Sequence, residues 1–183
     1  MAERQRSLRH ATEAKIRSVS VELGRRKFGI FYLCFRPNGL SSLAMPVIVA
    51  ETDSDIQACW PVLVQLRPHL REQDTIPVVR KQYAEGYRLA FVRRDEEVHG
   101  VAGYRILHSL WKGRHLYVDD LVTDEAARSQ GVGAELMDWL CAFARQQGCG
   151  WLELDSGVQR FEAHRFYLRH RMLISCHHFS RKL

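Results

Sequence analysis

The chain has 183 residues, 46% of them hydrophobic, and this length and composition suit one globular domain with a sizeable core. No run of about 18 apolar residues occurs, so the sequence predicts neither a membrane span nor a membrane partner. The formal net charge is +6, but residues 46–183 hold 18 residues of each sign, and the whole excess lies before them.

The first 44 residues are expected to form a basic N-terminal extension of uncertain order, followed by a folded domain at 46–183. Residues 1–45 hold nine Lys or Arg and three Glu. Because the rest of the chain is neutral, its charge argues against a nucleic-acid partner. Binding of nucleic acid by the basic extension is the alternative.

Five widely spaced cysteines, with no Cys-x-x-Cys pair, argue against a disulfide framework and against a zinc site. They favour a reducing compartment, so we expect a cytoplasmic protein without a metal. The adjacent Cys176, His177 and His178 do not change this expectation, because neighbours on a strand point to opposite faces and no further ligand has suitable spacing.

The first predicted element of the folded domain is a strand at Val47–Glu51. Thr52 or Asp53 can cap a helix that runs to about Leu66, and a second helix starts near Asp74–Thr75. Three strands follow and form an antiparallel meander, because only short turns separate them. They span Tyr87–Val92, Val98–Leu110 and His115–Val122.

The second half of the domain reads as helix, strand, helix and strand. A helix follows Gly131 and Gly133 and ends at Gly148, and the next strand, Trp151–Asp155, is parallel to the one before that helix. A helix at Phe161–His170 and a closing strand at Leu173–Phe179 complete the order. The predicted fold class is α/β (α+β), with a mixed, mostly antiparallel sheet of six to seven strands and helices on both faces.

The most specific segment of the chain runs from Leu121 to Ala134, where an apolar strand leads through a polar connection into a glycine-containing helix start. Glycines let backbone N–H groups approach a ligand closely, and a helix N-terminus carries partial positive charge. These features predict a pyrophosphate site. The spacing matches neither the dinucleotide fingerprint nor the P-loop.

The Arg128-x-x-Gly131-x-Gly133 pattern, with its strand before and amphipathic helix after, resembles the signature of the GCN5-related N-acetyltransferases (GNAT). The resemblance implies the acyl-CoA N-acyltransferase fold, an N-acetyltransferase domain at 46–183, and acetyl-CoA as co-substrate. It also implies that one segment binds the pantetheine arm and the pyrophosphate. By position, this segment comprises Leu121, Val122, Thr123, Arg128, Ser129, Gln130, Gly131, Val132, Gly133 and Ala134.

Acetyl transfer to an amine requires removal of a proton, because an alkylammonium with a pKa near 10 is protonated at neutral pH. Asp119-Asp120-Leu121 resembles the Glu-Asp-Leu of polyamine-type acetyltransferases, which implies Asp119 as general base and leaves Asp120 as a second candidate. Strand alternation separates the two carboxylates unless a bulge intervenes, and the family has such a bulge here. Capping or pairing with Arg is the structural alternative.

Ala163-His164-Arg165-Phe166-Tyr167 resembles the Ala-x-x-Phe-Tyr element of the family, which implies Tyr167 as the general acid that protonates the leaving thiolate. A half-buried aromatic side chain with a purely structural role is the alternative. The chain departs from the family at two places: Arg160 stands where an Asn is usual, and Arg171-Met172 where Gly-Phe is usual.

These resemblances imply an N-acetyltransferase that moves the acetyl group from acetyl-CoA to a primary amine of a small molecule or protein, by direct attack in a ternary complex. A non-catalytic acyl-CoA-binding regulatory domain is the alternative. The acceptor pocket has no diagnostic sequence, so the acceptor stays open. The class is also compatible with a homodimer.

Overall fold

The structure, a computed structural model, describes residues 47–183, and the basic extension expected at 1–44 lies outside the described residues. Five strands form one sheet in the order β1-β2-β3-β4-β5, antiparallel throughout except for the parallel pair β4 and β5. The strands are β1 (Val47–Val49), β2 (Tyr87–Arg94), β3 (Glu97–Ser109), β4 (Gly113–Thr123) and β5 (Trp151–Leu154). The helices are α1 (Asp53–Leu66), α2 (Thr75–Ala84), α3 (Val132–Gln146) and α4 (Phe161–Arg169), with short 3₁₀ turns η1 (Glu72–Asp74) and η2 (Glu125–Ala127).

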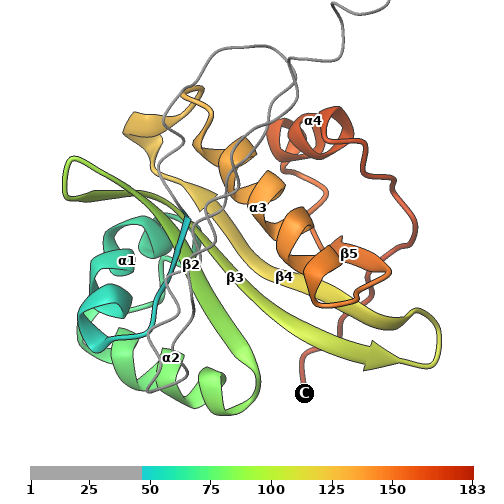
Figure 1. Cartoon of the computed structure of the whole chain (residues 1–183), viewed down its shortest axis with the longest axis horizontal. Helices are drawn as coiled ribbons and strands as arrows, with labels where there is room; N and C mark the ends of the chain where they lie inside the picture. Colours follow the sequence, from blue (N-terminus) through green and yellow to red (C-terminus); the bar gives the residue numbers. More distant parts are fainter. Residues whose placement is uncertain (1–46) are drawn as a thin grey trace, which may run out of the picture. The chain divides into compact units, whose positions relative to one another are not determined.

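The order of these elements agrees with the sequence prediction up to α4, including the parallel crossover to β5 (Figure 1). The predicted closing strand is wrong, because residues 173–179 carry no regular secondary structure. In the part of the chain that the structure describes, the sheet therefore has five strands rather than six to seven. The side chains of Leu173 and Phe179 are 84% and 91% exposed, so these apolar residues do not pack against a sheet.

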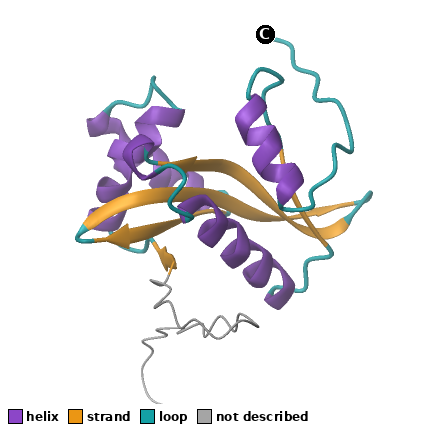
Figure 2. Ribbon diagram, turned by 90° about the horizontal axis from the view of Figure 1, so that it is seen from above, coloured by secondary structure: helices purple, strands orange, loops and turns teal. Residues whose placement is uncertain are grey.

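The sheet separates two hydrophobic clusters, one on each face. Leu89, Phe91 and Val101 face the cluster that α1 and α2 complete, while Ala90 and Val92 face the cluster beneath α3. Alternate residues of a strand point to opposite faces, so the continuous apolar run in β2 is explained by helices on both sides. Figure 2 shows α3 on the opposite side of the sheet from α1 and α2.

Local signals account for the ends of the helices. Thr52 begins α1 with a capping box, in which its hydroxyl accepts from the Asp55 backbone N–H and the Asp55 carboxylate accepts from the Thr52 backbone N–H.

No helix among residues 47–183 is long and apolar enough to cross a membrane.

Gly103 is required for packing at the centre of the sheet, because a Cβ built on it would lie 1.8 Å from the Tyr87 hydroxyl oxygen. Tyr87 is 2% exposed and cannot move aside into solvent. We expect Gly103→Ala to lower the free energy of unfolding by about 1–3 kcal/mol, measured by denaturant titration.

Gly150→Ala is the matched control for this prediction. Nothing lies within 4 Å of the Cβ that would be added to Gly150, so the free energy of unfolding of Gly150→Ala is expected to stay within about 0.5 kcal/mol of the parent. Equal stability of the two variants would contradict the role assigned to Gly103.

Candidate functional site

The two parallel strands β4 and β5 pair over only four residues and then separate. The pairs run from His115 with Trp151 to Val118 with Leu154. Beyond Val118, β4 continues to Thr123 in contact with β3 alone, whereas the chain leaves β5 for α4. The backbone edge of β4 from Asp119 to Thr123 therefore has no strand beside it among the described residues, and its polar groups can pair with an extended ligand.

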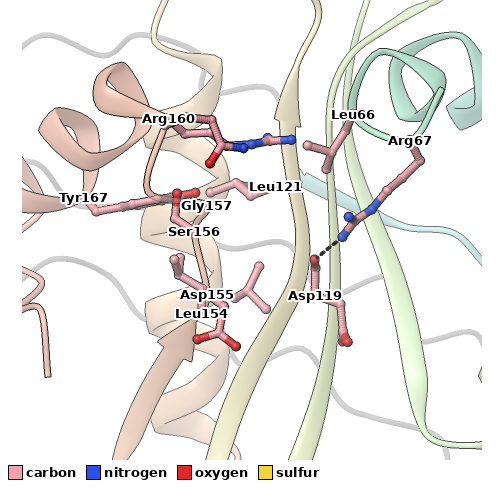
Figure 3. Close-up of a pocket in the computed structure, with 12 residues that line it drawn as sticks. Leu66, Arg67, Asp119, Leu121, Leu154, Asp155, Ser156, Gly157, Arg160 and Tyr167 are labelled. Atoms are coloured by element: carbon pink, nitrogen blue, oxygen red, sulfur yellow. Dashed lines mark hydrogen bonds between the residues drawn. The ribbon is translucent and has the colours of Figure 1, made fainter. Parts of the chain in front are cut away.

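A pocket of about 240 Å³ occupies this separation (Figure 3). Leu121 lines it, whereas Val122 packs into the cluster beneath α1 and α2, as the alternation of the strand requires. Thr123 lies at the end of β4, with its hydroxyl oxygen next to Gly133 in the first turn of α3. The predicted arm-binding segment thus leads directly from the pocket to the start of α3.

At the start of α3, no side chain among the described residues caps the helix. Gly131 is the N-cap residue with φ +86°, a left-handed conformation that favours glycine. The first-turn N–H groups of Val132, Gly133 and Ala134 donate to no capping side chain among the described residues. This N-terminus can therefore bind an anion through main-chain groups and the helix dipole.

The remaining predicted coenzyme residues form the turn before α3. Arg128 is exposed and donates to Glu125, and the Gln130 side-chain amide donates to the Ala126 carbonyl oxygen, so both side chains hold the turn itself. Ser129 has φ +65° and an exposed side chain. Hydrogen bonds between residues three and four positions apart thus fix the shape of the turn. Because these two side chains are used in this way, a ligand would contact mainly the backbone of the turn.

Asp119 lies in a β-bulge. Tyr104 pairs with Val118 and Gly103 pairs with Asp120, which leaves Asp119 as an additional residue in β4. The Asp119 carboxylate accepts a hydrogen bond from Arg105 Nε at 2.8 Å through one oxygen, and the other oxygen has no hydrogen-bond partner among the described residues. Asp119 lines the pocket between the strands.

Asp120 has both carboxylate oxygens occupied. Arg67, the residue that ends α1, donates from Nε to one oxygen at 2.7 Å, and the Tyr87 hydroxyl donates to the other at 2.9 Å. Arg67 also donates to the Asp119 carbonyl oxygen at 2.9 Å, the contact drawn in Figure 3. Burial, and then the charge of Asp120, raises the pKa of Tyr87 well above its ordinary value, which keeps this hydroxyl a donor.

Tyr167 projects from α4 into the same pocket as Asp119 (Figure 3). Burial raises the pKa of the Tyr167 hydroxyl, and the positive charge of Arg160 partly opposes this rise. The hydroxyl is therefore protonated at neutral pH and can donate a proton. Asp120 does not line this smaller pocket, so the three predicted catalytic residues share only the larger pocket described next.

A larger pocket of about 1070 Å³ continues from this site, between α1 and α2 on one side and α4 and residues 172–178 on the other. Both aspartates and Tyr167 line it. Asp155, at the end of β5, lines both pockets, and one of its oxygens accepts from the Tyr117 hydroxyl at 2.6 Å and contacts His178 Nδ1 at 3.1 Å.

Sequence reasoning missed four residues of this site: Arg67, Tyr87, Asp155 and Ser156. The Ser156 hydroxyl oxygen is buried without a partner among the described residues, although Ser156 lines both pockets. A buried hydroxyl without a hydrogen bond costs about 1–3 kcal/mol, so it favours a ligand that provides one. No group of three or more His, Cys, Asp or Glu side chains within 47–183 is placed to hold a metal ion.

The chain is similar in sequence to known acetyltransferases. The family model described as "Acetyltransferase (GNAT) family" matches residues 50–171. N-acetyltransferase YhdJ of Bacillus subtilis, itself uncharacterized, is 34% identical over 109 residues, which are 59% of this chain and 77% of that protein. An aminoalkylphosphonate N-acetyltransferase of Salmonella typhimurium is 37% identical over 87 residues, 45% of this chain and 53% of that protein.

The fold also matches solved structures. The crystal structure of an acetyltransferase from Trypanosoma brucei superposes with a TM-score of 0.64 at 22% sequence identity, covering 75% of this chain and 99% of that one. The chain belongs to the GNAT family of acetyltransferases.

Proposed function

We propose that residues 46–183 form an N-acetyltransferase domain that transfers the acetyl group of acetyl-CoA to a primary amine, by direct attack in a ternary complex. The observation that carries this proposal is the shared pocket of Asp119 and Tyr167, which opens at an unpaired strand edge beside an uncapped helix start. A carboxylate and a protonated hydroxyl in one pocket are suited to remove one proton and deliver another.

Residues of this chain fit the coenzyme in two parts. The backbone of Leu121, Val122 and Thr123 would hold the pantetheine arm, because no strand of the described part of the chain pairs with that edge of β4. The main-chain N–H groups from Gly131 to Ala134 would hold the pyrophosphate, with Ser129 and Gln130 in the turn beside them and Arg128 adding charge nearby. When bound, acetyl-CoA supplies an acetyl group activated as a thioester.

Asp119 is the better candidate for the general base. One of its carboxylate oxygens is held by Arg105, the other has no hydrogen-bond partner among the described residues, and the residue lines both pockets. Asp120 uses both oxygens for Arg67 and Tyr87, so we assign it to holding the bulge in place. Tyr167 keeps its proton at neutral pH and would donate it to the departing sulfur.

The relatives support an amine as acceptor. The Salmonella typhimurium relative acts, by its name, on an aminoalkylphosphonate, which is a small molecule with an amine. The larger pocket continues from Asp119 and has the volume of a small-molecule site. We therefore propose a small-molecule amine rather than a protein as the acceptor.

Thiol release from acetyl-CoA tests this function directly. The full chain is mixed with acetyl-CoA and a panel of primary amines, free thiol is followed with a chromogenic reagent, and the products are identified by mass spectrometry. Release that depends on an amine, together with the acetylated amine, is expected. Tight binding of acetyl-CoA without amine-dependent release would instead favour a regulatory domain.

Introducing a negative charge at Ser129, in the turn before α3, tests the coenzyme site independently of turnover. Ser129→Asp and Ser129→Asn have nearly the same shape, and both residues tolerate the left-handed conformation of this position. We expect Ser129→Asp to weaken acetyl-CoA binding roughly tenfold or more, because a carboxylate would repel the phosphates, whereas Ser129→Asn stays close to the parent. Isothermal calorimetry measures both, and equal affinities would contradict the assignment.

A further inference from the structure

We propose that the acceptor is a primary amine with an apolar, uncharged body, such as an alkylamine or arylalkylamine. This inference rests on the proposed function and adds the class of acceptor. The larger pocket carries the argument, because its charged and apolar side chains are segregated.

The charged side chains that line the larger pocket lie together where it meets the smaller one. Among the described residues they are Arg67, Asp119, Asp120 and Asp155. Asp120 pairs with Arg67 and Asp119 pairs with Arg105, whereas Asp155 has no Lys or Arg partner in residues 47–183; Asp119 and Asp155 each keep one carboxylate oxygen without a hydrogen-bond partner there. This end of the pocket therefore attracts a positively charged group, as an incoming ammonium requires.

Aliphatic side chains and a methionine form the largest group in the rest of the lining, beside His, Tyr, Gln, Ser and Cys side chains, and this part carries no Lys, Arg, Asp or Glu among the described residues. Several of the aliphatic side chains are open to solvent: Val78 is 44% exposed, Leu168 is 52% exposed and Ile174 is 78% exposed. Apolar side chains that gather around a cavity mark a ligand site when a ligand can cover them. The apolar residues are Leu63, Leu70, Val78, Val79, Val158, Leu168, Met172, Leu173 and Ile174.

Uncharged polar side chains also line the pocket, but only the histidines among them can become positively charged and so attract an anionic acceptor. His178 contacts Asp155, and His164 contacts the Gly157 carbonyl oxygen at 3.0 Å through Nε2, so both already have partners. His69 and His177 are exposed at the pocket lining. A phosphonate or carboxylate is usually held by Arg, and the lining Arg is already paired.

Three amines of equal chain length test the proposal. Hexylamine ends in a methyl group, aminohexanoate in a carboxylate and hexanediamine in a second ammonium, while the reacting amine is the same. We expect kcat/KM for hexylamine to exceed both others by roughly tenfold or more, because only its tail can be desolvated against the aliphatic lining. Equal or better turnover of either charged-tail amine would overturn the proposal.

Ile174→Arg should shift this preference. The substitution places a cation at the aliphatic lining on an exposed, irregular segment, so the fold should tolerate it. We expect kcat/KM for hexylamine to fall and that for aminohexanoate to rise, whereas Leu183→Arg, exposed and outside the lining, changes neither. An unchanged ratio in Ile174→Arg would count against the acceptor class.

Calorimetric titration of hexylamine into the protein saturated with coenzyme A gives a readout that is independent of turnover. Binding weakened by Ile174→Arg and unaffected by Leu183→Arg is the expected result. If acetyl-CoA binds but thiol is released with none of the amines, neither those of the panel nor the three test amines, the proposed function itself fails. If short polar amines react and hexylamine neither binds nor reacts, only the acceptor class fails.

Discussion

Asp119→Asn is expected to lower kcat at neutral pH by roughly a hundredfold or more, because an amide cannot take the proton of the incoming ammonium. Asp119 lies in the bulge, lines the pocket and keeps one carboxylate oxygen unpaired among residues 47–183, and Asn preserves the size of the side chain and an oxygen that can accept from Arg105. Stopped-flow thiol release at saturating amine and acetyl-CoA measures the effect.

The pH dependence separates a general base from a structural role. Below the amine pKa of about 10, the neutral fraction of the acceptor rises roughly tenfold with each pH unit. The deficit of Asp119→Asn should therefore shrink as pH rises, while Asp119→Glu should recover part of the rate at neutral pH. A deficit that is constant with pH, or accompanied by a lower melting temperature, would argue that Asp119 only supports the strand.

Tyr167→Phe is expected to lower kcat by about a hundredfold with little change in acetyl-CoA affinity, because the departing sulfur would lose its proton donor. The raised pKa of Tyr167 determines the sign of the pH effect: the hydroxyl keeps its proton over the whole neutral range and loses it only in alkaline solution, above the ordinary pKa of tyrosine. The advantage of Tyr over Phe should thus persist at neutral pH and decline at strongly alkaline pH.

Tyr83→Phe is the matched control for this substitution. The Tyr83 hydroxyl donates to the Ala50 carbonyl oxygen at 2.7 Å and lies outside both pockets. Its loss is expected to cost about 1 kcal/mol of stability and to leave kcat unchanged. If Tyr167→Phe behaved like Tyr83→Phe, the Tyr167 hydroxyl would have no part in the reaction.

The elements that the sequence predicts correctly are those with a local signal. Thr52 marks the start of α1, the short turns mark the meander, and Gly131 marks the start of α3 through a backbone conformation that glycine favours. The predicted closing strand fails because a strand exists only when another strand pairs with it. Alternating or clustered apolar residues, such as those at 173–179, do not reveal whether that partner is present.

The interactions that shape the candidate site are instead distant in the sequence. Arg67 lies 53 residues before Asp120, and Tyr87 lies 33 residues before it, yet both bind the same carboxylate. No local pattern links an arginine at a helix end to a strand bulge. The sequence could therefore indicate Asp119 and Asp120 only as a pair, whereas the three-dimensional arrangement distinguishes them: Arg67 and Tyr87 occupy both oxygens of Asp120, and Asp119 keeps one oxygen unpaired among residues 47–183.

Arg67 makes the length of α1 a constraint on the geometry of β4. Its guanidinium group reaches both the Asp120 carboxylate and the Asp119 carbonyl oxygen from the residue that ends the helix. Inserting or deleting one residue within α1 would rotate that end by about 100° around the helix axis and carry the guanidinium group away. Length variation should therefore be tolerated after Arg67, in the connection to η1, and be harmful within the helix.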